Sequence, residues 1–86
     1  MTWTKAASPQ YGDERRGDLA LSIALSRAMR AKGVSQRDLA EMTGIRKETI
    51  SRILSGRRRP SAKTLMLITS ALGVSAEEII QDMKKN

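Results

Sequence analysis

Two short amphipathic helical patterns on either side of Gly44 constrain this chain more than any other feature. Ser35 stands before the first pattern as a helix N-cap, and Asp38 at the third helical position makes a near relative of the capping box. Gly44 stands where that pattern ends and a left-handed turn is needed, a conformation that glycine adopts without a Cβ clash. The second pattern, at about 46–54, carries isoleucines on one side and basic residues on the other. We therefore expect two helices joined by a tight turn over about residues 36–55.

Three further helical patterns surround this pair. They cover about residues 19–32, 62–72 and 76–83, and their expected N-caps are Asp18, Ser61 and Ser75 respectively. Their apolar residues recur at helical spacing, and those of the first pattern are predicted to face a core. The apolar positions of the three patterns are Leu21, Ala24, Leu25, Ala28, Leu65, Ile68, Ala71, Leu72, Ile79, Ile80 and Met83. Met29, Met42 and Met66, with Met83, are expected to fill that core. Because no segment has the alternation of a strand, the prediction is an all-α, compact five-helix fold.

The domain organisation that these patterns indicate is simple. Residues 1–17 contain glycine and proline but no periodic apolar residues, which predicts a flexible N-terminal arm. Residues 18–83 are predicted to form one small domain, and 84–86 a polar tail. Arg15 and Arg16 leave open that the arm contacts a partner, beside the plainer interpretation of a disordered end.

Composition excludes several function classes. The chain has no Cys and no His, so a disulfide framework, a thiolate metal site and the commonest general base are all missing. The two adjacent acidic pairs, Asp13 with Glu14 and Glu77 with Glu78, are not placed to face each other across a site. We expect no enzyme activity, no metal and no cofactor.

Charge points to a polyanionic partner. The formal net charge is +7, and residues 44–63 hold seven basic residues against one acidic residue, Glu48, which is +6 of that total. A local cationic face suits nucleic acid, although an ordinary solvated basic surface gives the same count. No apolar run approaches the ~20 residues of a membrane span. The expected location is the cytoplasm, and a membrane partner is not expected.

The order of motifs along the chain carries a resemblance. Its elements are Lys32-Gly33-Val34-Ser35-Gln36, Leu39-Ala40-Glu41, Gly44-Ile45, Thr49-Ile50-Ser51-Arg52-Ile53, Ser55-Gly56-Arg57, Arg59-Pro60-Ser61 and Ala71-Leu72-Gly73-Val74-Ser75. In this order and spacing the chain resembles the lambda-repressor/Cro-like helix-turn-helix family, also called the Xre family, over about residues 25–80. Two positions depart from the family pattern. Arg46 stands where a capping Ser or Thr is usual, so that Thr43 or water is expected to cap instead, and Leu54 stands where Glu is usual.

The resemblance implies a sequence-specific, double-stranded-DNA-binding transcriptional regulator, and a repressor in particular. Its base-contacting residues would be Arg46, Lys47, Glu48, Thr49 and Arg52. Arginine and lysine pair with guanine O6 and N7, and a glutamate accepts from cytosine N4. The plainer alternative for Glu48 is an ion pair with Arg52 on a solvated helix face.

Contacts to the DNA backbone are implied on both sides of these residues. The residues expected to make them are Ser35, Gln36, Arg57, Arg58, Arg59, Ser61 and Lys63. Phosphate contacts of this kind set affinity and register rather than sequence preference. One of the three arginines could enter the minor groove instead.

The expected assembly is a homodimer, at least on DNA, that binds a palindromic operator. Its possible interface is Leu54, Ile79, Ile80 and Met83, the alternative being that these residues close the core of a monomer. An antitoxin-type or other partner-binding protein, whose DNA binding serves autoregulation, is the main alternative function. The apolar side of the 19–32 pattern, with Leu54, favours such a protein partner. A non-specific module for RNA or anionic membrane is a further alternative, and the lack of interleaved aromatic residues argues against single-strand stacking.

Overall fold

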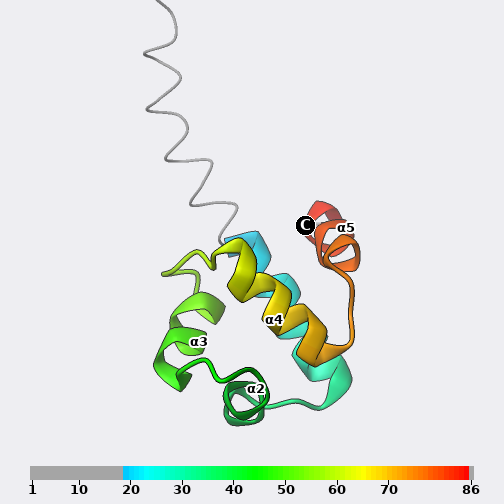
Figure 1. The fold of residues 1–86 in the computed structure, drawn as a ribbon. Coiled ribbons are helices and arrows are strands. Elements are labelled where there is room, and N and C mark those ends of the chain that lie inside the picture. Colours follow the sequence, from blue (N-terminus) through cyan, green and yellow to red (C-terminus); the bar gives the residue numbers. More distant parts are fainter. Residues whose placement is uncertain (1–18, 86) are drawn as a thin grey trace, which may run out of the picture.

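Five helices and no strand make up residues 19–85, the part of the chain that the computed structural model describes (Figure 1). The first helix covers residues 19–32, and it is followed by α2 (Gln36–Thr43), α3 (Lys47–Leu54), α4 (Ala62–Leu72) and α5 (Ala76–Lys85). The all-α prediction and the order of the five helices are confirmed. The predicted arm, the Asp18 cap and Asn86 lie outside the described residues.

α2 and α4 connect the other helices. α2 packs against both α3 and α4, and α4 also contacts α5. In the view of Figure 1, α4 passes in front of the first helix. An ion pair between Arg27 Nη1 and Asp82 Oδ1, at 3.3 Å, joins the first helix to α5. α3 and α5 lie on opposite sides of α4 and share no contact. The outer surfaces of α3 and α5 are therefore spatially separate.

The core is built from the aliphatic residues that the periodicity predicts. Every helix contributes to it, and its buried members are Ala24, Leu25, Met29, Leu39, Ile50, Ile53, Ile68, Leu72 and Ile79. Two buried hydroxyl groups are satisfied within their own helices, since Ser22 donates to the Leu19 carbonyl and Thr69 to the Leu65 carbonyl. No helix among residues 19–85 is long and apolar enough to cross a membrane.

Helix starts follow the predicted caps. The Ser61 hydroxyl accepts from the Thr64 N–H at 3.1 Å, and the Ser75 hydroxyl accepts from the Glu78 N–H at 3.0 Å. Each cap satisfies one of the N–H groups that have no partner inside a helix.

Three details differ from the predictions. Met42 and Met66 are 54% and 65% exposed, so the expectation that they fill the core is wrong. Each lies on the outer side of a helix whose buried stripe is narrow. α3 begins at Lys47 rather than at Arg46. α5 continues two residues past the predicted end at Met83, to Lys85, since lysine forms helix well and its charge is favourable in a last turn.

Candidate nucleic-acid interface

The start of α2 is fixed by a complete capping box. The Ser35 hydroxyl accepts from the Asp38 N–H at 3.0 Å, and the Ser35 N–H donates to Asp38 Oδ2 at 3.1 Å. Hydrogen bonds from the Ser35 N–H and hydroxyl hold the pKa of Asp38 below its ordinary value, since they favour the ionised carboxylate. This reciprocal pair sets the position of Gln36, the first residue of α2.

The turn between α2 and α3 is tied by backbone and hydroxyl hydrogen bonds. Gly44 has a φ of +79°, the left-handed conformation predicted for it, and its N–H donates to the Ala40 carbonyl. The Thr43 hydroxyl donates to the Leu39 carbonyl at 2.7 Å and accepts from the Ile45 N–H at 3.1 Å. Of the two caps expected for α3, Thr43 or water, Thr43 is therefore ruled out. Its hydroxyl instead links the last turn of α2 to Ile45 in the turn between the two helices.

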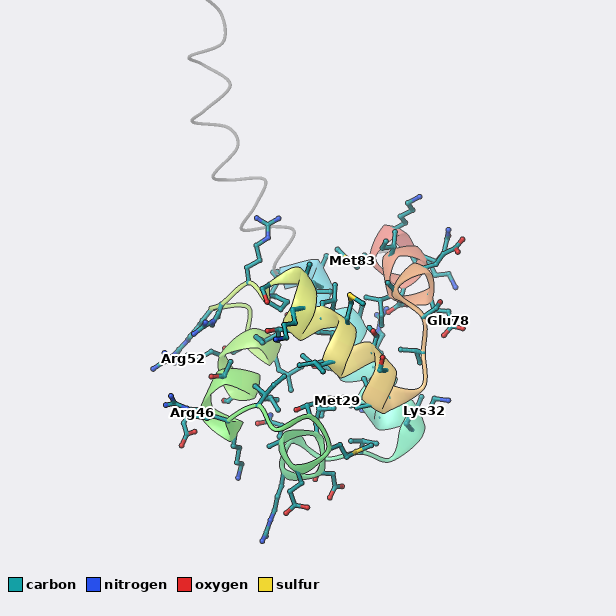
Figure 2. The ribbon with its side chains drawn as sticks, in the orientation of Figure 1. Met29, Lys32, Arg46, Arg52, Glu78 and Met83 are labelled. Atoms are coloured by element: carbon teal, nitrogen blue, oxygen red, sulfur yellow. The ribbon has the colours of Figure 1, made fainter. Side chains whose placement is uncertain are left out.

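Arg46 is the N-cap of α3 and makes no side-chain cap hydrogen bond. The first backbone donors that bond inside this helix are the Thr49 and Ile50 N–H groups, both to the Arg46 carbonyl. The first-turn amides of α3 thus have no side-chain acceptor among the described residues. Figure 2 shows the Arg46 and Arg52 side chains projecting to the same outer side of α3.

A shallow hollow brings five of the predicted DNA-contacting residues together in space. It is lined by one residue of α2, four of α3 and one of the loop that follows: Gln36, Lys47, Glu48, Ser51, Arg52 and Arg57. Ile50 and Ile53 are buried on the opposite side of α3 and hold this face outward. Thr49 is half-buried on the flank of the helix and does not line the hollow.

Ser51 is the lining residue that was not predicted. It is exposed, and it lies one helical turn after Lys47, so the two share a face at i,i+4 spacing. The same spacing argument that singled out the neighbouring cations could have found it. Its hydroxyl both donates and accepts, so it can bond to either kind of polar atom on a base or phosphate.

The loop after α3 is folded back onto its last turn. The Arg52 carbonyl accepts from the Arg57 N–H at 2.9 Å, from the Arg58 N–H at 3.2 Å and from the Ser55 hydroxyl at 3.1 Å. Gly56, with a φ of +79°, makes the reversal possible. The backbone thereby holds the first loop arginine beside the α3 face.

The other predicted backbone-contacting residues lie beyond the hollow. Arg58, Arg59 and Lys63 are exposed, and Arg59 takes part in an interaction within the protein. The Ser61 hydroxyl is engaged in its cap and also donates to Thr64 Oγ1 at 3.0 Å.

Two glutamates with an arginine four residues away behave differently. On α2, Arg37 Nε lies 3.8 Å from Glu41 Oε2. On α3, Glu48 and Arg52 have the same spacing, yet the Glu48 carboxylate makes no ion pair or side-chain hydrogen bond with any residue in the range 19–85. The one acidic side chain in the basic segment is thus available to an external donor.

The four residues considered for a dimer interface lie in different environments. Ile79 is 4% exposed and belongs to the core of the single chain, whereas Ile80 is 48% exposed. Leu54 and Met83 are half-buried and pack against the core. Of the four, Ile80 presents the most apolar surface to a partner.

Comparison with known proteins places the chain in a family. The protein-family model described as "Helix-turn-helix" matches residues 25–79. The clp gene regulator ClgR from C. glutamicum is 29% identical, with a TM-score of 0.76 over 79% of this chain and 87% of that chain. The tetramer of the restriction-modification controller protein C.Esp1396I, solved with its natural 35 base-pair operator, is 28% identical, with a TM-score of 0.73 over 79% of this chain and 90% of that chain.

Two further likenesses are more limited. The controller protein C.AhdI from Aeromonas hydrophila shares the fold, with a TM-score of 0.70 at 24% identity over 73% of this chain and 96% of that chain. A 49-residue segment, 57% of this chain, is 39% identical to the replication factor C small subunit of Methanocaldococcus jannaschii, and it spans 3% of that protein's length. The family match covers most of the chain and contains both helices of the hollow. The chain therefore belongs to the helix-turn-helix family of the lambda-repressor/Cro-like type, a family of DNA-binding transcription regulators.

Proposed function

We propose that this protein binds a specific operator in double-stranded DNA and acts as a transcriptional repressor. α3 would lie in the major groove, which admits one α-helix. The observation that carries the proposal is the shared hollow, because it joins the start of α2, the outer face of α3 and the arginine loop in one surface. In a helix-turn-helix the second helix lies in the major groove while the first crosses the DNA backbone.

Side-chain chemistry supports a division of contacts within this surface. Lys47 and Arg52 carry donors that match guanine O6 and N7, and Arg46 projects to the same side as Arg52. Thr49, on the flank of α3, would contact DNA only at the edge of the groove. Each well-made bidentate pair discriminates between bases by about 1–3 kcal/mol.

Backbone contacts would come from the two borders of the hollow. Gln36 lines the hollow from α2 and Arg57 from the loop after α3, and the exposed Arg58 follows Arg57 in the chain. Ser35, Arg59, Ser61 and Lys63 complete the proposed phosphate-contacting set. The uncapped amides of α3 add donors that suit an anion at the positive end of a helix dipole.

The test is selection of bound duplexes from a random DNA pool at roughly physiological salt. Wild type is compared with Lys47→Ala/Arg52→Ala and with a charge-matched control, Arg30→Ala/Lys32→Ala. Both control residues are exposed, and Figure 2 places Lys32 far from Arg46 and Arg52. We expect wild type and the control to enrich the same sequence and the α3 variant to lose it. Equal binding of every duplex by all three proteins, with a steep salt dependence, would contradict specific recognition.

The proposed assembly is a dimer on a palindromic operator. The exposed Ile80 and the half-buried Met83 offer apolar surface on α5, which shares no contact with α3. A dimer made there would leave both copies of α3 free for DNA. An enriched inverted repeat with half-sites about one helical turn apart would support it, and a single unrepeated half-site would contradict it.

A second candidate function is supported by the exposed apolar side chains of the first helix. Leu19 and Ile23 are exposed and lie away from the buried stripe. An antitoxin-type protein would use such a face to hold a protein partner, with DNA binding for autoregulation. Co-purification of a second small protein in a fixed ratio, lost in Leu19→Ser/Ile23→Ser but not in the α3 variant, would favour this function.

A further inference from the structure

The starting observation is the Glu48 carboxylate. It lines the hollow among Lys47, Arg52 and Arg57, and it makes no ion pair with any of them. A carboxylate has acceptor atoms only. In the major groove it would be repelled by phosphate oxygens and by the acceptor atoms of guanine and thymine. Its favourable partners on the base edges are the two exocyclic amino groups, cytosine N4 and adenine N6.

The chemistry of those amino groups limits what Glu48 can accept. In a Watson–Crick pair one amino hydrogen bonds to the opposite base, and the second projects into the major groove. A methyl group on the nitrogen takes the groove position, because the other hydrogen is required for pairing. A carboxylate facing that methyl group is desolvated without a hydrogen bond, which is costly for a charged group.

We propose that Glu48 makes operator binding depend on an unmethylated exocyclic amino group, so that amino-methylation of the DNA releases the protein. This inference rests on the proposed function, since it requires α3 to lie in the major groove. It adds a regulatory input that acts through the DNA rather than through a small molecule. The shared ligand chemistry is a primary exocyclic amine, supplied by either cytosine or adenine.

The test uses the full chain and the duplex enriched by wild type in the random-pool selection. Each cytosine of a half-site is replaced in turn by N4-methylcytosine, and each adenine by N6-methyladenine. We expect one position to weaken wild-type binding about tenfold or more, the loss expected for a good base contact. The modified base at that position identifies which of the two amines Glu48 accepts from.

Three variants assign the effect to the carboxylate. In Glu48→Ala the penalty at that position should disappear, with methylated and unmethylated duplexes bound equally. Glu48→Gln keeps an acceptor oxygen and should retain a penalty. Glu41→Ala removes the same charge from α2, outside the hollow, and should keep the full penalty. If the position is a cytosine, 5-methylcytosine there keeps both N4 hydrogens and should cause no penalty that depends on Glu48.

The outcomes separate this inference from the proposed function. If wild type enriches a sequence but no amino-methylated position weakens binding, the inference is overturned and operator binding stands. A penalty that persists unchanged in Glu48→Ala overturns it as well. If no sequence is enriched, both the inference and the proposed function fail.

Discussion

α2 and α3 have the same length and lie on either side of one turn, yet their polar groups are used in opposite ways. α2 is eight residues long, and it has a closed capping box and an ion pair between Arg37 and Glu41. α3, also eight residues long, has no side-chain cap, and within residues 19–85 Glu48 and Arg52 form no ion pair at the same spacing. Both bury isoleucine or leucine on one side. α2 therefore satisfies its polar groups within its own helix, whereas α3 leaves donors and an acceptor available to an external partner.

The largest expected difference is in DNA affinity. Arg37 and Arg52 are both exposed arginines, but only Arg52 lines the hollow. Arg52→Ala should weaken binding to the selected duplex by about tenfold or more, and Arg37→Ala by about twofold at most. Fluorescence anisotropy at fixed salt measures both. Equal losses in the two variants would mean that arginine acts only through net charge, and the distinction between the helices would fail.

The turns that end the two helices provide a stability test. Gly44 and Gly56 both have a φ of +79°, so alanine at either position should cost about 1–2 kcal/mol of folding free energy. Gly56→Ala should also weaken DNA binding, because Gly56 directs the arginine loop onto the Arg52 carbonyl. Urea denaturation and anisotropy on the same samples separate the two effects. DNA binding that weakens equally in Gly44→Ala would show a general loss of structure instead.

The caps should respond in opposite directions. Ser35→Ala opens the capping box and should cost about 1 kcal/mol of folding free energy. Arg46→Ser gives α3 the cap it lacks and should stabilise the fold by about 0.5 kcal/mol or more while reducing DNA affinity. Urea midpoints measure the stabilities. A destabilised Arg46→Ser would mean that the arginine side chain supports the fold itself.

The smallest effect is the pH dependence of the α2 cap. The Ser35 hydrogen bonds lower the pKa of Asp38 in the folded state, so the folded state binds this proton less readily than the unfolded state. The resulting stabilisation is present above the ordinary carboxyl pKa of about 4 and is lost as the pH falls through the lower folded value. Wild type should be more stable than Asp38→Asn at pH 6, and the gap should narrow toward pH 3. A gap that stays constant would contradict the cap assignment.

Local chemistry explains what could be predicted from the sequence. Ser35, Ser61 and Ser75 cap because a hydroxyl before a helical pattern has few competing roles, and Gly44 turns because few other residues tolerate its φ. Periodicity likewise placed Ile50 and Ile53 inside and the cations of α3 outside.

The remaining features depend on the width of a buried stripe, on small free-energy differences and on the backbone path, none of which the sequence pattern indicates. Periodicity gives the direction of a buried stripe but not its width, so the exposure of Met42 and Met66 was not predictable. An exposed i,i+4 ion pair contributes about 0.3–0.5 kcal/mol, too little for the sequence to decide that Arg37 pairs with Glu41 while Arg52 does not pair with Glu48. The loop after α3 is held on the Arg52 carbonyl by backbone N–H groups. Apart from Gly56, no residue type in the sequence indicates this path.

Arg52 has two roles: its carbonyl holds the loop, and its side chain is proposed to contact DNA. The two roles can be varied independently. The loop is held by the main chain of the residue, so exchanging its side chain leaves the hydrogen bonds from Arg57, Arg58 and Ser55 in place. The other side chains of the α3 face are also exposed, at positions 47, 48 and 51. A library randomised at these four positions, with proline and glycine excluded, should therefore consist largely of folded proteins that differ in the DNA they select. Under the proposed function, substitutions on this surface would change which DNA sequence is preferred while the fold of the domain stays the same.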